Sequence, residues 1–244
     1  KRMKLDILVL AAHPDDAELA MGGTIAKLGK NNLKVGIIDL TRGELGTRGT
    51  AETRQREAFN AALVLKTSVR ENLEVPDGDI KNSKENLMKV VIAIRKYKPK
   101  IVFAPYFNDR HPDHIDASHL IKRAMFSTGL SKIKTFDKEV PQNYYRPEKL
   151  FYYMQTYTFE PTFIVDISDT FDLKMKETAS PRLRSHSSTG IIYSNDSPAF
   201  MLNTNFPIPP TSLKAPSSRY WNVTFSHIVL SKTDFTNGVP CGSH

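Results

Sequence analysis

Short apolar runs alternate with helical stretches along the first 175 residues of the chain. Apolar runs typical of buried strands lie at residues 5–12, 34–40, 69–73 and 101–105. Each run precedes a stretch with apolar residues at helical spacing, at residues 18–30, 51–65, 83–98 and 115–127. Two further strands are expected at residues 150–153 and 163–167. This alternation predicts an α/β fold in which right-handed crossovers build a mostly parallel sheet.

The composition changes near residue 178. Residues 180–244 contain 12 Ser, 6 Thr and 7 Pro but no Glu, whereas residues 1–179 contain 11 Glu. We therefore predict one domain at residues 1–179, followed at 180–244 by an atypical Ser/Thr/Pro-rich segment that is loop-rich or partly disordered. Apolar clusters at residues 191–193 and 220–230 leave open a strand within that segment.

The formal net charge of +8 indicates a solvated basic surface. Basic residues are scattered beside acidic ones, without a basic arm or a nucleic-acid motif, so we expect no nucleic-acid partner. A single cysteine, Cys241, excludes an internal disulfide and a Cys-based zinc site. No apolar run approaches the roughly 20 residues that cross a bilayer, and the first residues do not resemble a signal peptide. We expect a cytoplasmic protein that does not bind membranes.

Two related motifs follow two of the predicted strands. Residues 13–16 read His-Pro-Asp-Asp, and residues 111–114 read His-Pro-Asp-His. Adjacent parallel strands would bring these two loops to one point, and ligand sites in open α/β sheets form at such strand ends. A catalytic zinc ion takes three ligands from His, Asp or Glu and keeps one position open. His13 and Asp16 with His114 form such a set, although spacing alone does not decide between His111 and His114.

Asp15 and His111 then lie beside the metal as candidate base and acid. The structural alternative is that the two aspartates simply cap a helix, which is the usual role of aspartates at such positions. The metal interpretation is favoured because related motifs recur at two strand ends.

A glycine-rich loop at residues 43–49 separates the second predicted strand from the next helix. It lacks the Lys-Ser/Thr ending of a phosphate-binding P-loop. The loop and its flanks carry four charged side chains, Arg42, Glu44, Arg48 and Arg54. Because arginine binds carboxylates in a bidentate fork, this region indicates a contact with an anionic substrate group. The alternative is a flexible turn.

Three strings in order, LAAHPDDAELAMGGTIAKL, IIDLTRGELGTRGTAETRQREA and FNDRHPDHIDAS, closely resemble the LmbE-like (PIG-L) family of zinc deacetylases. Within that family the chain looks most like the deacetylases of bacillithiol synthesis, which act on N-acetylglucosaminyl malate. The resemblance extends from about residue 5 to residue 175. It implies a Rossmann-like three-layer sandwich, one Zn²⁺ per chain and a small amino-sugar substrate. It leaves homo-oligomerisation open.

The resemblance also implies roles for individual residues. The zinc ligands of the family correspond to His13, Asp16 and His114. The general base corresponds to Asp15, the acid or oxyanion-stabilising histidine to His111, and the aspartate that orients this histidine to Asp113. The substrate-contacting arginine corresponds to Arg54, with Arg110 and Glu44 as further candidates.

The sequence thus predicts a zinc-dependent hydrolase that removes the N-acetyl group from an N-acetylglucosamine conjugate, with N-acetylglucosaminyl malate as the first choice. One alternative is another substrate of this class, such as a chito-oligosaccharide or an inositol conjugate. A second alternative is a metal-binding, sugar-binding protein with impaired catalysis, which the atypical C-terminal segment suggests.

Overall fold

The computed structural model describes residues 3–47, 49–178, 191–194, 197–201 and 227–232. The helices are α1 (Asp16–Lys30), α2 (Ala51–Val64), α3 (Lys84–Tyr97), α4 (Pro112–Ser127) and α5 (Phe171–Thr178), with a short 3-10 helix, η1 (Ser168–Thr170), before α5. The strands are β1 (Ile7–Ala11), β2 (Val35–Asp39), β3 (Val69–Asn72), β4 (Ile101–Pro105), β5 (Thr135–Asp137), β6 (Val140–Gln142), β7 (Lys149–Tyr153), β8 (Phe163–Asp166), β9 (Ile191–Ser194), β10 (Ser197–Met201) and β11 (His227–Lys232).

Seven strands form the main sheet in the order β3-β2-β1-β4-β7-β11-β8. The first five strands run parallel to one another. The strand β11 is antiparallel to both β7 and β8. The predicted α/β fold with a mostly parallel sheet is therefore confirmed. The strand order reverses between β1 and β4, and in open α/β sheets a ligand crevice forms at such a switch point.

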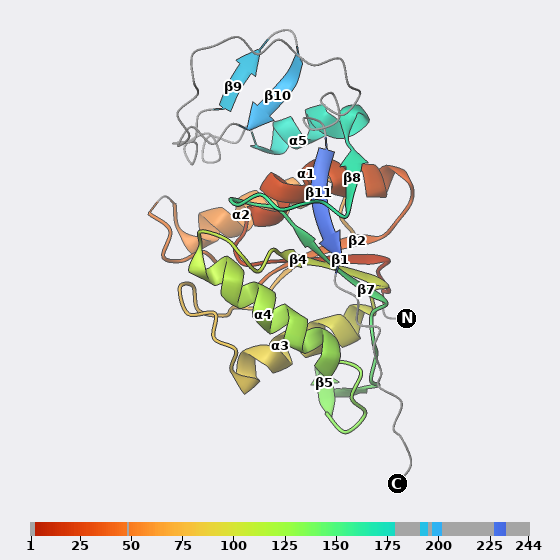
Figure 1. Cartoon of the computed structure of the whole chain (residues 1–244). Helices are drawn as coiled ribbons and strands as arrows, with labels where there is room; N and C mark the ends of the chain where they lie inside the picture. The colour runs from red at the N-terminus through yellow and green to blue at the C-terminus, as the bar shows by residue number, and fades with distance from the viewer. Residues whose placement is uncertain (1–2, 48, 179–190, 195–196, 202–226, 233–244) are drawn as a thin grey trace.

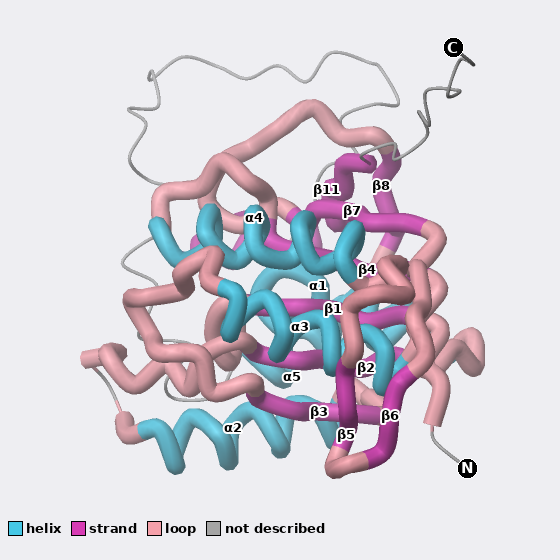
Figure 2. The backbone as a smooth tube through the Cα atoms, turned by 90° about the horizontal axis from the view of Figure 1, so that it is seen from below, coloured by secondary structure: helices cyan, strands magenta, loops and turns pink. Residues whose placement is uncertain are grey.

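Helices cover both faces of this sheet, which gives three layers (Figures 1 and 2). Alternate residues of β1 enter different cores: Leu8 and Leu10 pack with α3 and α4, while Ile7 and Val9 pack with α1. Every residue of β1 and β2 is buried. Strands covered on both faces read as continuous apolar runs, which is why these strands were predictable from the sequence.

Local signals explain where the helices begin. The hydroxyl of Thr50 accepts the Thr53 N–H at the start of α2, and that of Ser83 caps α3 in the same way. Helix α4 begins at Pro112, earlier than the predicted residue 115, because proline suits the first turn of a helix. Both His-Pro-Asp motifs therefore lie at helix N-termini, at the ends of β1 and β4.

The hairpin of β5 and β6 was not expected from the sequence. Its turn residues, Lys138 and Glu139, have φ values of 48° and 67°. Turns with two positive φ values usually carry Asn-Gly or Asp-Gly, so this sequence gives no hairpin signal.

Three strands belong to the predicted C-terminal segment. Strands β9 and β10 pair with each other, and β11 joins the main sheet between β7 and β8. The apolar cluster at residues 191–193 thus lies in a strand, and the cluster at 220–230 overlaps β11. The rest of the segment at 180–244 lies outside the described residues, so its proposed disorder and the domain division at residue 179 stay predictions.

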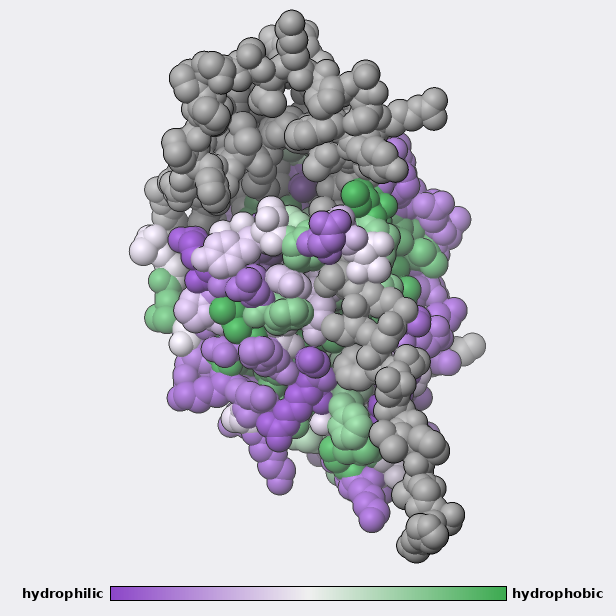
Figure 3. All heavy atoms as spheres, viewed as in Figure 1, coloured by the Kyte–Doolittle hydropathy of each residue, from purple (hydrophilic) through white to green (hydrophobic). Residues whose placement is uncertain are grey.

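No helix in the described part of the chain is both long and apolar enough to cross a membrane. The face over α3 and α4 is mostly hydrophilic, with smaller apolar areas between the charged side chains (Figure 3).

Candidate metal centre and active site

The two His-Pro-Asp motifs meet at the carboxyl edge of the sheet, because β1 and β4 are adjacent parallel strands. The Nε2 atom of His114 lies 3.2 Å from Asp16 Oδ1. The Nδ1 atom of His13 lies 3.4 Å from Asp16 Oδ2. All three residues are buried. The structure thus brings the three predicted ligands together, with their donor atoms within 4.8 Å of one another.

This donor set fits one zinc-type ion. Zinc binds His nitrogen and carboxylate oxygen at about 2.0–2.2 Å, so two donors in a tetrahedral arrangement lie about 3.4 Å apart. The distances from Asp16 to the two histidines, 3.2 and 3.4 Å, match that spacing. The set of His13, His111 and Asp113 has compatible donor spacing as well, but His111 is exposed. The geometry favours His114 because it is buried and faces Asp16.

The second ring nitrogen of His13 faces two carboxylates. Its Nε2 atom lies 3.0 Å from Asp77 Oδ1 and 3.2 Å from Asp113 Oδ2. Burial lowers the pKa of His13, but hydrogen bonds with Asp113, Asp16 and Asp77 outweigh it and raise the pKa to about 12. Without a metal this imidazole is therefore protonated. Metal binding would displace the Nδ1 proton, because a ligand histidine must offer a bare nitrogen.

The sequence predicts that Asp113 orients His111. The Asp113 carboxylate contacts His13, as above, and accepts the backbone N–H of Gly78 at 2.8 Å. The link to His111 runs instead through the backbone, since the N–H of Asp113 donates to His111 Nδ1 at 3.2 Å.

Asp109 supports His114 in the way that Asp77 supports His13. Its Oδ1 atom lies 3.0 Å from His114 Nδ1, and its carboxylate also accepts the backbone N–H groups of His111 and Thr156. Burial raises the pKa of Asp109, but these hydrogen bonds, led by the one with His114, outweigh it and lower the pKa to about 2. Ligand histidines commonly donate their second N–H to such a carboxylate.

Asp15 has a strained backbone, with φ 134° and ψ −24° just before α1. Such conformations cost on the order of 1–3 kcal/mol in non-glycine residues and concentrate at functional sites. Burial, and then the charge of Asp16, raise the pKa of Asp15 to about 7, while the charge of Arg54 opposes them. A carboxylate in that range exchanges protons efficiently near neutral pH.

Arg54 lies beneath the glycine-rich loop and is only 7% exposed. A Cβ atom on Gly46 would overlap the Arg54 guanidinium, and one on Gly43 would lie 2.5 Å from its Nη1. The glycines thus allow the loop to close over this side chain. The positive charge of Arg54 lowers the pKa of Asp15, so this side chain influences the predicted base.

The two other substrate-contact candidates are both exposed. Glu44 Oε1 accepts the backbone N–H of Asp77 at 2.9 Å, which gives it a structural role at the loop. Arg110 directly precedes His111 in the chain.

Three polar side chains of this site were not predicted from the sequence. Asp77 and Asp109 are described above, and Gln155 Nε2 donates to Asp16 Oδ1 at 2.8 Å. They lie in the loops that follow β3, β4 and β7, respectively. The signal that revealed the two motifs, a polar residue after a parallel strand, applied to these residues as well.

A buried ionic network lies close to the metal ligands. The Arg70 guanidinium donates to both oxygens of Asp39, at 2.8 and 3.0 Å, and also contacts Glu18. All three side chains are at most 7% exposed. Arg70 therefore compensates two carboxylates that are removed from water.

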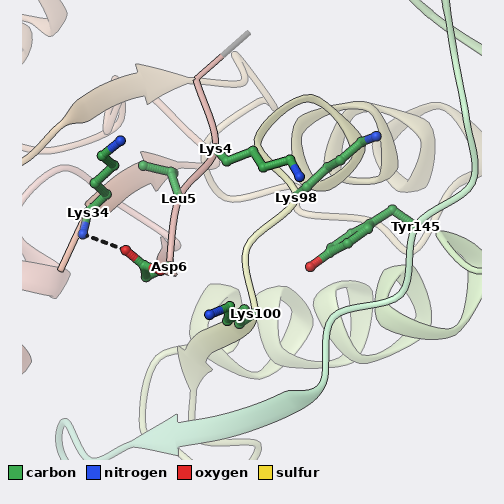
Figure 4. A pocket seen from close by; sticks show the side chains of 7 residues that line it. All are labelled: Lys4, Leu5, Asp6, Lys34, Lys98, Lys100 and Tyr145. Carbon is green, nitrogen blue, oxygen red and sulfur yellow. Dashed lines mark hydrogen bonds between the residues drawn. The ribbon is translucent and has the colours of Figure 1, made fainter.

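A hollow of about 250 Å³ lies at the opposite, amino edge of the sheet. It is lined by Lys4, Leu5, Asp6, Lys34, Lys98, Lys100 and Tyr145. The ammonium groups of Lys34 and Lys98 lie on opposite sides of the hollow, so they do not converge on one ligand position (Figure 4). This hollow is therefore not the candidate site.

The sequence profile described as PIG-L, GlcNAc-PI de-N-acetylase, matches residues 8–125, which include both motifs. Diacetylchitobiose deacetylase of Thermococcus kodakarensis is 30% identical over 182 residues, which are 70% of this chain and 66% of that protein. The part of the chain that carries both motifs therefore matches the PIG-L family of deacetylases. The match spans 66% of the length of the Thermococcus kodakarensis protein.

Two solved structures are similar to this chain. The conserved protein TT1542 of Thermus thermophilus has a TM-score of 0.71 and 31% identity, and the match covers 98% of this chain and 100% of that one. The N,N'-diacetylchitobiose deacetylase of Pyrococcus horikoshii has a TM-score of 0.63 and 28% identity, covering 75% and 69% of the two chains.

Proposed function

We propose that this chain is a metal-dependent hydrolase that removes the acetyl group from the nitrogen of an N-acetylglucosamine-type sugar. The observation that carries this proposal is the buried set of His13, Asp16 and His114 with the strained Asp15 beside it. The match to the PIG-L family, with two similar proteins named as diacetylchitobiose deacetylases, supports the class of substrate.

We assign one zinc ion per chain to His13, Asp16 and His114, because two imidazoles and one carboxylate with an open position are typical of catalytic zinc. When bound there, the ion supplies a Lewis acid for the amide carbonyl and for the attacking water. Asp77 and Asp109 hold the second nitrogens of the two histidines, so both rings present their remaining nitrogen toward Asp16.

The proton of the attacking water is assigned to Asp15 and the charge of the oxyanion to His111. Asp15 takes the proton of the attacking water, which suits a carboxylate with a raised pKa, and can pass it to the leaving amine. His111 Nδ1 accepts the Asp113 N–H, so the neutral ring carries its proton on Nε2 and can donate a hydrogen bond to the oxyanion. Burial, and then the charges of His13 and His114, lower the pKa of His111, which favours this neutral form.

For the substrate we propose N-acetylglucosaminyl malate. Arg54 lies under the glycine-rich loop and its charge acts on Asp15, while Arg110 is adjacent in the chain to His111. Two arginines near one site favour an anionic aglycone, because guanidinium groups bind carboxylates bidentately. The second candidate is diacetylchitobiose, which the names of two relatives favour. The cytoplasmic location and the oligomeric state stay predictions.

The test is acetate release by the zinc-loaded protein from N-acetylglucosaminyl malate, diacetylchitobiose and an inositol-linked N-acetylglucosamine. We expect the malyl substrate to have the highest kcat/KM, and Arg54→Gln to reduce that preference by raising KM. Equal or better turnover of diacetylchitobiose would make that compound the preferred candidate substrate. Binding of these sugars without acetate release would contradict the hydrolase proposal and support the sugar-binding alternative.

A further inference from the structure

The loop between β3 and α3 reaches the ligand histidine from a third strand of the sheet. Asp77, in this loop, lies 3.0 Å through Oδ1 from His13 Nε2, closer than Asp113 at 3.2 Å. Its side chain is 8% exposed. The next residue, Gly78, donates its backbone N–H to the Asp113 carboxylate at 2.8 Å. The loop therefore supplies or binds both carboxylates that face His13 Nε2.

The same loop is bonded to the glycine-rich loop on its other side. Asp77 Oδ2 accepts the backbone N–H of Leu45 at 2.9 Å. The backbone N–H of Asp77 donates to Glu44 Oε1, also at 2.9 Å. One carboxylate thus contacts the candidate metal ligand with one oxygen and the loop that covers Arg54 with the other.

We propose that Asp77 is a positioning residue that fixes the ring of His13 with Nδ1 toward Asp16 and anchors the glycine-rich loop beside it. The proposal rests on the metal assignment of the proposed function. Its first part follows from hydrogen-bond direction: a carboxylate only accepts, so Nε2 carries the proton and Nδ1 is left bare for the metal. Its second part follows from the Leu45 bond, which sets the loop at a fixed distance from His13.

The decisive variant is Asp77→Asn. If its amide oxygen keeps the Leu45 N–H, its NH₂ group faces His13 Nε2, and two donors oppose each other. This favours the His13 tautomer with the proton on Nδ1, which cannot bind the metal. We expect zinc affinity, measured by competition with a chromophoric chelator, to fall about 10- to 100-fold, the usual effect of losing such a partner.

Two matched variants separate this role from a general effect on the loop. Asp79→Asn changes an exposed aspartate of the same loop that pairs with Lys81 at 2.8 Å, and we expect unchanged zinc affinity. Glu44→Ala removes the acceptor for the Asp77 backbone N–H while leaving the Asp77 carboxylate intact. We expect it to raise KM for the sugar and to leave zinc affinity within about twofold of the parent.

A measurement on the unaltered protein keeps the proposal testable if a variant fails to fold. Nitrogen NMR of the zinc-loaded protein should show His13 protonated at Nε2 and bound at Nδ1. Protonation at Nδ1, unchanged zinc affinity in Asp77→Asn, or equal losses in Asp77→Asn and Glu44→Ala would each overturn the role of the carboxylate. The proposed function fails separately, if the zinc-loaded parent protein releases no acetate.

Discussion

The two edges of the parallel sheet both gather charged residues, yet only the carboxyl edge brings them to one point. There, His13, Asp16 and His114 are buried, and both imidazoles lie within bonding distance of the Asp16 carboxylate. At the amino edge, the side chains of Lys34 and Lys98 line a hollow from opposite sides and do not meet (Figure 4). A group of charged residues is therefore a candidate site only where their side chains converge on one point.

The helices account for part of this difference. Helices α1 and α4 begin at the carboxyl edge, where their free N–H groups and positive dipole ends favour carboxylates such as Asp16 and Asp113. Helix α3 ends at the amino edge, where Lys98 is its C-cap. Cations suit that end, so a structural role for this lysine is sufficient.

The largest expected effect is at the carboxyl edge. His114→Ala should abolish both zinc binding and deacetylation, because two remaining protein ligands rarely hold zinc tightly. Elemental analysis measures the metal, and acetate release measures the activity. His119→Ala, an exposed histidine of the same helix, is the control. A full equivalent of zinc in His114→Ala would transfer the ligand role to His111.

Asp15→Asn separates catalysis from metal binding at the same edge. We expect kcat to fall by about two to four powers of ten, the usual effect of losing a general base, while one zinc ion is retained. Parallel loss of zinc and activity would instead make Asp15 a ligand or a structural cap.

Arg70→Met tests whether the buried carboxylates near the site need their cationic partner for the stability of the fold. Removing the guanidinium leaves Asp39 and Glu18 uncompensated, so we expect the free energy of unfolding to fall by about 3–5 kcal/mol. Urea unfolding measures it. Arg123→Met, an exposed arginine that bonds to Asn82, should cost about 0.5 kcal/mol or less. Equal losses of the free energy of unfolding in the two variants would show that the buried ionic network is no more important for stability than an exposed arginine.

The smallest effect is expected at the amino edge. Lys34→Ser and Lys100→Ser change exposed side chains, so each should alter the free energy of unfolding by about 0.5 kcal/mol or less. Acetate release should be unchanged. A large loss of activity in either variant would show that this edge contributes to function and would weaken the contrast between the edges.

Much of the fold was predictable because its signals are local. The apolar run of β1 and the Ser83 cap of α3 each act within a few residues. The hairpin of β5 and β6 escaped prediction because its turn residues, Lys138 and Glu139, lack the usual glycine or asparagine. The comparisons support the PIG-L family that the motifs indicated, through a match over residues 8–125, whereas the malate substrate is still a proposal.

The sequence by itself determined the parallel sheet and the residue types at the ends of β1 and β4, because hydrophobic periodicity and two short motifs encode them. Only the tertiary structure showed that His114 faces Asp16 while His111 is exposed. It also showed that Asp77, 64 positions from His13 in the chain, contacts that ring. Such contacts depend on which strands become neighbours in the sheet and on the paths of the loops that follow them. No local sequence pattern specifies a contact between residues so far apart in the chain.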